Sequence, residues 1–144
     1  MHTIMIVDDE ASVLAGLARL FGRVRGISLL TCDTPHEGLQ LAATQNIDLF
    51  IADYRMPGMN GVEFLVFARQ IQPGAVRFLL SGTSDFTGLA NAVNRASIHR
   101  FIPKPIDSRE LLFMVRQGLV EGVAAANLNP GPAPVVGNAL GSGR

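Results

Sequence analysis

Residues 49–58 of this 144-residue chain read LFIADYRMPG: four apolar residues run directly into an acid, and a Pro-Gly turn follows. Similar runs stand at Ile4–Val7 and Val76–Leu80, and weaker ones at Ile27–Thr31 and His99–Ile102. Continuous apolar runs, unlike alternating ones, are typical of strands covered on both faces, as in a parallel sheet. The sequence therefore predicts five strands of a buried parallel sheet.

Stretches with the helical spacing of apolar residues separate these strands. The clearest lie over residues 13–24, 64–71 and 111–123, and shorter ones lie over 39–43 and 89–96. Pro73-Gly74 predicts the end of one helix, and Asp107 or Ser108 predicts the cap of the last. Five strand-then-helix units predict a doubly wound α/β fold, with parallel strands, right-handed crossovers and helices on both faces.

Composition excludes several classes of function. Twelve Lys and Arg balance twelve Asp and Glu, so the chain lacks the basic surface that a nucleic-acid-binding or polybasic membrane-binding protein needs. A single cysteine, Cys32, allows neither an internal disulfide nor a Cys-rich zinc site, which favours a reducing compartment. No secretory signal and no membrane-spanning stretch is visible. We therefore expect a soluble cytoplasmic protein that does not contact membranes.

The composition changes near the C-terminus. Residues 124–144 contain three Pro, four Gly and no aromatic residue. Such a segment buries too little apolar surface to offset the entropy of ordering it. The sequence predicts one domain over residues 1–123, followed by a flexible Pro/Gly/Ala-rich tail or a truncated linker over residues 124–144.

Polar residues with potential chemistry stand where the predicted strands end. Asp8 and Asp9 follow the first strand, Asp53 ends the third, Ser81 ends the fourth, and Lys104 follows the fifth. Each is, alone, equally typical of a turn, a helix cap or an exposed loop. Ligands of doubly wound folds bind beyond the carboxyl ends of the strands, so we expect three carboxylates, a hydroxyl and an ammonium to converge there.

This set of groups suits a phosphorylated species with Mg²⁺. Clustered carboxylates repel one another, and Mg²⁺, which prefers oxygen ligands, relieves that repulsion. Lys104 offers a compact cation for a phosphoryl oxygen, and Asp53, the central acid, is the candidate nucleophile that would carry an aspartyl-phosphate. Neither glycine-rich phosphate motif is present. A haloacid-dehalogenase type of phosphatase would need a second Asp where Arg55 stands.

These residues together resemble the response-regulator receiver domain of two-component signalling. The matching segments are Ile6–Glu10, Asp53–Gly61, Leu80–Gly82 and Phe101–Pro105, and the similarity covers about residues 3–122. The resemblance implies a flavodoxin-like (βα)5 fold, whose five parallel strands are arranged in the order 2-1-3-4-5.

The resemblance also implies a role for each residue of the predicted site. Asp53 matches the aspartate that accepts the phosphoryl group. Asp8 and Asp9 match the acidic pair that holds Mg²⁺, and Arg55 matches the position whose backbone carbonyl completes the metal site. Lys104 matches the lysine that contacts the phosphoryl oxygens.

Further positions match the parts of the family that respond to phosphorylation. Ser81 matches the switch hydroxyl, and Phe101 matches the switch aromatic, although a plain core phenylalanine is the alternative there. The Lys104–Pro105 bond matches one that is cis in the family. Arg55 and Thr83 occupy positions that influence the lifetime of the phosphoryl group.

The implied function is that of a phosphoacceptor. A sensor histidine kinase or a phosphotransfer protein supplies the phosphoryl group. The face formed by the fourth helix, fifth strand and fifth helix then changes its affinity for a partner, which is a downstream protein, an output domain or a second copy of the chain. The chain is expected to be no enzyme beyond self-phosphorylation and slow autodephosphorylation, and not to bind nucleic acid itself. Two alternatives remain open: the regulatory domain of a longer regulator whose output domain, enzymatic or DNA-binding, is missing, or a phosphorylation-independent dimerisation or scaffold module.

Overall fold

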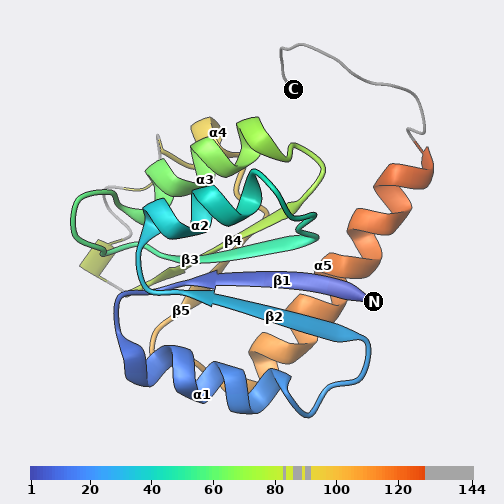
Figure 1. The fold of residues 1–144 in the computed structure, drawn as a ribbon, viewed down its shortest axis with the longest axis horizontal. Coiled ribbons are helices and arrows are strands. Elements are labelled where there is room, and N and C mark those ends of the chain that lie inside the picture. Colours follow the sequence, from blue (N-terminus) through green and yellow to red (C-terminus); the bar gives the residue numbers. More distant parts are fainter. Residues whose placement is uncertain (83, 86–88, 90–91, 129–144) are drawn as a thin grey trace.

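The computed structural model describes residues 1–82, 84–85, 89 and 92–128. In chain order, the elements are β1 (His2–Val7), α1 (Ala11–Phe21), β2 (Ile27–Cys32), α2 (Pro35–Ala42), β3 (Leu49–Asp53), α3 (Gly61–Ile71), β4 (Val76–Ser81), α4 (Ala92–Ala96), β5 (Arg100–Pro103) and α5 (Ser108–Leu128). The strands form one parallel sheet in the order β2-β1-β3-β4-β5 (Figure 1). The predicted α/β fold and its strand order are confirmed.

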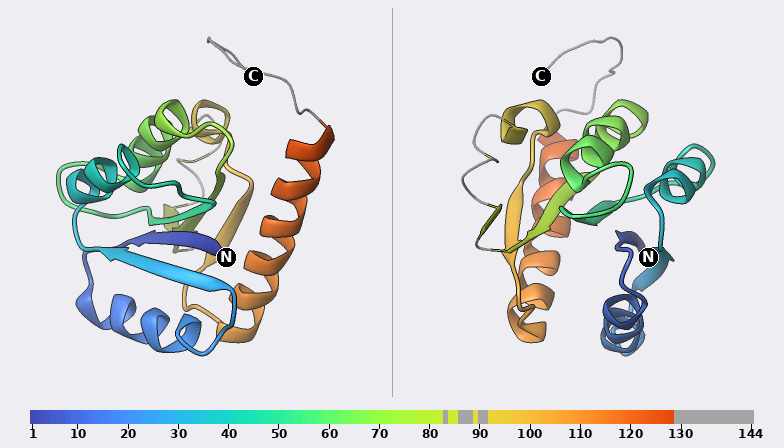
Figure 2. Two further views of the ribbon diagram at one scale, coloured as in Figure 1. Left: turned by 45° about the vertical axis from the view of Figure 1, so that its right-hand side comes forward. Right: turned by 90° about the vertical axis from the view of Figure 1, so that its left-hand side faces the viewer.

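The sheet lies between two layers of helices. Figure 2 shows α1 and α5 on one face and α2, α3 and α4 on the other. Because β3 is central, all five of its residues are buried. Alternate β3 side chains enter opposite cores: Phe50 packs on the α3 side, with Phe64 at a ring-centroid distance of 5.9 Å, while Ile51 packs with Phe21 on the side of α1 and α5. The strand that carries Asp53 is therefore fixed from both faces.

Side-chain caps fix where three of the helices begin. At α2, Thr34 Oγ1 accepts a hydrogen bond from the Glu37 amide at 3.2 Å. At α3, Asn60 accepts a hydrogen bond from the Glu63 backbone, and the Glu63 carboxylate accepts one from the Asn60 backbone. This reciprocal box satisfies two amides that a helix start otherwise leaves unpaired. Asp107, rather than Ser108, caps α5, since its Oδ1 accepts from the Glu110 amide at 3.1 Å.

Helix ends differ from the predictions at two places. Helix α1 ends at Phe21, before Val24, because the chain tightens there into turns, with the Val24 amide donating to the Phe21 carbonyl. Helix α5 continues to Leu128, past the boundary expected after Val123. The remainder of the predicted tail, residues 129–144, lies outside the described residues, as do residues 90–91 of the helix predicted over 89–96. No helix in the described ranges is long and apolar enough to span a bilayer.

A buried arginine interrupts the apolar run of β4. Arg77 is 4% exposed, and its guanidinium donates to the backbone carbonyls of Pro73, Ala75, Ala96 and Ser97. Burial lowers the pKa of Arg77 to about 10, so the side chain stays charged at neutral pH. These charged donors tie the end of α4 and the loop between α3 and β4 to strand β4, next to the edge strand β5.

Candidate functional site

The strand register brings the predicted residues to one edge of the sheet. Val7 pairs with Ala52, so Asp8 and Asp53 emerge side by side. On the other side of β3, Asp53 pairs with Leu80, and Ser81 pairs with Pro103, the residue before Lys104. The carboxyl ends of β1, β3, β4 and β5 therefore converge, as the sequence predicts.

Three carboxylates meet at this edge, and one of them was not among the predicted metal ligands. Asp8, Glu10 and Asp53 offer oxygen atoms that all lie within 4.8 Å of one another. The Glu10 amide donates to Asp8 Oδ1 at 2.9 Å, a short-range turn that folds Glu10 back over the site. Asp9 is exposed and is not a member of this group among the described residues. Its negative charge nevertheless adds to burial, the main cause, in raising the pKa of Asp53.

The carboxylates at the centre of the site are unusually buried. Asp8 is 0% exposed and Asp53 is 2% exposed. Burial, together with the charge of Asp53, raises the pKa of Asp8 to about 6, against a hydrogen bond from the Glu10 amide that lowers it. Burial likewise raises the pKa of Asp53, although Lys104 opposes this. Excess negative charge is thus concentrated where a cation would relieve it.

Lys104 supplies the positive charge nearest to Asp53. Its Nζ lies 2.5 Å from Asp53 Oδ1. Burial by itself would lower the pKa of Lys104, but the hydrogen bond and charge of Asp53 outweigh it and raise that pKa. The Lys104 amide also donates to the Ser81 carbonyl at 3.1 Å, and the Lys104–Pro105 bond is cis, as predicted.

Two buried polar atoms at the site have no hydrogen-bond partner within the described part of the chain. They are Asp8 Oδ2 and Ser81 Oγ. Such atoms are rare, because an unsatisfied buried group costs about 1–3 kcal/mol. Asp8 Oδ2 belongs to the carboxylate cluster, whose hard oxygen donors fit Mg²⁺. Ser81 Oγ is placed as a free hydroxyl donor at the end of the neighbouring strand.

The structure places the other predicted residues as follows. Phe101 is half-buried and packs against the core cluster on the α3 side, which fits either a switch aromatic or a core side chain. Thr83 lies outside the described residues. Arg55 lies in the loop after β3, and its side chain, rather than standing free, pairs with Asp85 at 2.6 Å.

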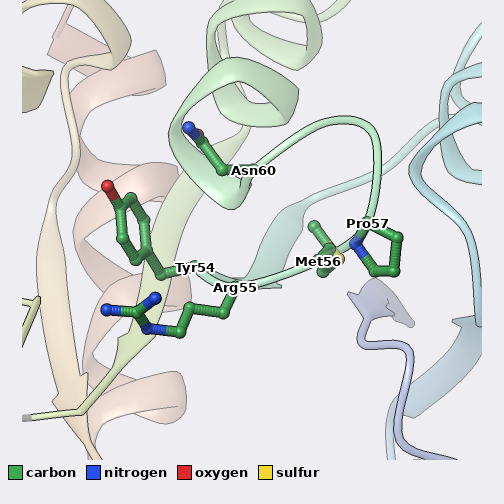
Figure 3. A pocket seen from close by; sticks show the side chains of 5 residues that line it. All are labelled: Tyr54, Arg55, Met56, Pro57 and Asn60. Atoms are coloured by element: carbon green, nitrogen blue, oxygen red, sulfur yellow. The ribbon is translucent and has the colours of Figure 1, made fainter.

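A shallow depression adjoins the site at the start of this loop. It has a volume of about 420 Å³ and is lined by Tyr54, Arg55, Met56, Pro57 and Asn60. Figure 3 shows Tyr54 and Arg55 extending from the loop in one direction, away from Met56 and Pro57. Asp85, which anchors Arg55, has no spacing pattern in the sequence that distinguishes it from an ordinary loop acid.

Comparison with known proteins gives one consistent family. Residues 4–116 match the family described as response regulator receiver domain. The chain is 34% identical over 117 residues to the hydrogenase transcriptional regulatory protein HoxA of Cupriavidus necator, which covers 81% of this chain and 24% of HoxA. It therefore spans about a quarter of the length of that relative.

Solved structures agree with this assignment. The signal receiver domain of an HD domain-containing protein from Pseudomonas fluorescens Pf-5 superimposes with a TM-score of 0.80 at 32% identity, covering 85% of this chain and 98% of that one. A CheY-like response regulator receiver domain protein from Methanospirillum hungatei JF-1 also gives a TM-score of 0.80, at 25% identity, covering 87% and 98%. The similarity thus extends over nearly the whole of each receiver domain.

Proposed function

Since this chain belongs to the response regulator receiver domain family of two-component signalling, we propose that Asp53 accepts a phosphoryl group from a sensor histidine kinase or a phosphotransfer protein. One observation carries the proposal: Asp53 belongs at once to the carboxylate cluster and to the ion pair with Lys104. A nucleophilic carboxylate needs neighbours that neutralise the transferring group, and both kinds are in place.

In the proposed step, a carboxylate oxygen of Asp53 attacks phosphorus. The new P–O bond forms as the bond from phosphorus to the donor's leaving atom breaks, and that atom is a histidine nitrogen in a kinase or an acetate oxygen in acetyl phosphate. Lys104 is held 2.5 Å from Asp53 before the reaction. The Lys104 ammonium is therefore already in place to stabilise the negative charge that develops on the phosphoryl oxygens.

The acidic residues of the site would hold the Mg²⁺ that receiver domains generally bind. Asp8 and Asp53 are the buried ligands, and we assign the remaining contacts to Asp9, to the Arg55 backbone carbonyl, or to Glu10, which lies close enough to replace Asp9. When bound, Mg²⁺ neutralises these carboxylates and the charge on the transferring oxygens. The unpartnered Asp8 Oδ2 supports this assignment.

Ser81 and Phe101 are the residues that we propose respond to phosphorylation of Asp53. The buried Ser81 hydroxyl gains the acceptor it lacks when a phosphoryl group stands on Asp53. Phe101, half-buried on β5 opposite Leu79, would then change its position. The outward result is a change in partner affinity at the face of α4, β5 and α5. That face would bind a downstream protein, an output domain or a second copy of this chain.

The direct test is phosphorylation by a small donor. Wild type treated with acetyl phosphate and Mg²⁺ is expected to gain one phosphoryl mass, and Asp53→Asn is expected to gain none. Chelation of the metal should also abolish the adduct in wild type. Intact-mass spectrometry after rapid quenching provides the measurement, with Asp33→Asn, an exposed acid outside the site, as the control that still reacts.

The absence of any adduct in wild type, together with no binding of beryllofluoride, would overturn the phosphoacceptor proposal. The chain would then act as a phosphorylation-independent dimerisation or scaffold module. An adduct that persists in Asp53→Asn would instead place the acceptor at another residue.

A second candidate is supported by the comparison with HoxA. This chain spans about a quarter of that transcriptional regulator, so we propose that the receiver can serve as the N-terminal regulatory domain of a longer protein with its own output domain. The chain's own chemistry would then be limited to self-phosphorylation and slow autodephosphorylation, in the cytoplasm where its phosphodonor acts. The length of the complete gene product tests this candidate directly.

A further inference from the structure

A second charged constellation lies beside the acceptor site. Asp85 follows β4 and has a side chain only 4% exposed, and both of its oxygens are engaged. Oδ1 accepts from Arg55 Nε at 2.7 Å and lies 2.6 Å from Arg55 Nη2, while Oδ2 accepts from the Gly82 amide at 3.0 Å. The Asp85 amide in turn donates to the Gly82 carbonyl at 3.1 Å. One buried carboxylate thus joins the loop after β3 to the turn after β4.

We call this group, Arg55–Asp85–Gly82, the clasp. Its two charged side chains differ in their exposure. The Arg55 side chain is 70% exposed, whereas Asp85 is almost entirely buried. A buried carboxylate that loses its cation is costly, while an exposed guanidinium remains solvated. Asp85 therefore determines where Arg55 lies, and in the described structure the cation paired with Asp53 is Lys104, not Arg55.

The clasp lies next to both groups that the proposed function uses. Arg55 stands two residues after Asp53, and Gly82 directly follows Ser81. A phosphoryl group carries close to two negative charges and three strong acceptor oxygens, so it competes with a carboxylate for a nearby guanidinium. If Arg55 turns to that group, Asp85 keeps only the Gly82 amide and the turn after Ser81 loosens.

We propose that Asp85 is a positioning residue for the phosphoryl site, which holds Arg55 away from Asp53 and fixes the Ser81-Gly82 turn until a phosphoryl group competes for the guanidinium. This inference rests on the proposed function. Because the phosphoryl mimic must break the clasp in order to recruit Arg55, a substitution that weakens the clasp is expected to strengthen binding of the mimic.

Beryllofluoride with Mg²⁺ is the probe that tests this coupling. The chain has one tyrosine, Tyr54, and no tryptophan, so intrinsic fluorescence reports from the residue after Asp53. Asp85→Asn keeps the shape and an oxygen for the Gly82 amide but releases Arg55. We expect it to bind beryllofluoride at least about fivefold more tightly than wild type does.

A double-mutant cycle separates this mechanism from a merely structural role. In an Arg55→Ala background, Asp85→Asn is expected to have no effect, because no guanidinium remains to be released. In an Arg55→Lys background, the retained cation should restore part of the effect. The matched control is Asp48→Asn, which changes an acid at the end of β3 opposite to Asp53 and should leave the affinity unchanged. Circular dichroism and urea denaturation establish that each variant is folded.

The outcomes distinguish the inference from the function on which it rests. If wild type does not bind beryllofluoride, the proposed function fails. If wild type binds and folded Asp85→Asn binds equally or more weakly, the clasp does not oppose the phosphorylated state. An effect of Asp85→Asn that persists in the Arg55→Ala background shows that Asp85 acts without Arg55, and it also overturns the inference.

Discussion

Adding one methyl group at Gly61 is expected to destabilise the fold by about 3 kcal/mol and to displace Asp53. Gly61 is the first residue of α3, and its amide donates to the Tyr54 carbonyl, which closes the loop that follows Asp53. A Cβ atom there would lie 2.3 Å from the Asp53 carbonyl oxygen and 2.8 Å from Leu79 Cδ1. Because the first contact is with backbone, no side-chain rotation relieves it, and β3 itself must move.

Urea denaturation measures the loss of stability in Gly61→Ala, and the rate of acetyl phosphate labelling measures the displacement of Asp53. The matched control is Gly74→Ala, because a Cβ at Gly74 meets open space and its backbone conformation suits alanine. That control should be neutral or stabilised by up to about 1 kcal/mol. Equal midpoints for the two variants would show that the loop after β3 tolerates movement and that Asp53 is less rigidly placed than the packing indicates.

The fold could be predicted because the strongest signals were local. The apolar runs at Ile4–Val7 and Leu49–Ala52 are typical of strands buried on both faces, and β1 and β3 indeed lie in the interior of the sheet. Helix ends were less predictable, since they depend on competing backbone hydrogen bonds. The apolar stripe up to Val24 predicts a longer helix than α1, whereas turn bonds after Phe21 end the helix and leave Val24 half-buried in the turn.

The site residues could be predicted where their position along a strand determines where they lie. They could not be predicted where side-chain contacts determine it. Asp53, Ser81 and Lys104 converge because parallel strands end at one edge. The placement of Glu10 depends instead on a turn closed by Asp8, and that of Asp85 on a partner thirty residues earlier in the sequence. Both arise from hydrogen bonds that no periodicity records, so the clasp became visible only in three dimensions.

The metal-free protein is expected to lose stability as the pH rises through about 6. Asp8 has a pKa raised from 3.8 to about 6 in the folded chain, chiefly by burial. The folded state therefore binds the Asp8 proton more tightly than the unfolded state does. This stabilisation is complete below about pH 4 and is lost above about pH 6, and a shift of about two units corresponds to about 3 kcal/mol.

Comparison of wild type with Asp8→Asn isolates this contribution from the other titrating groups. The amide keeps an oxygen for the Glu10 amide and removes the charge. In chelator, the variant should match wild type near pH 4 and exceed its free energy of unfolding by up to about 3 kcal/mol near pH 8.

Mg²⁺ should raise the stability of wild type near pH 8 and much less near pH 5. It should hardly raise that of the variant, because the ion requires the ionised carboxylate. A difference between the two proteins that stays constant with pH would mean that Asp8 is ionised throughout and that its burial is offset by a cation already in place. The Asp8 carboxylate therefore makes the metal-free protein less stable at neutral pH. The same carboxylate gives the site its affinity for Mg²⁺, the ion that the proposed phosphoryl transfer requires.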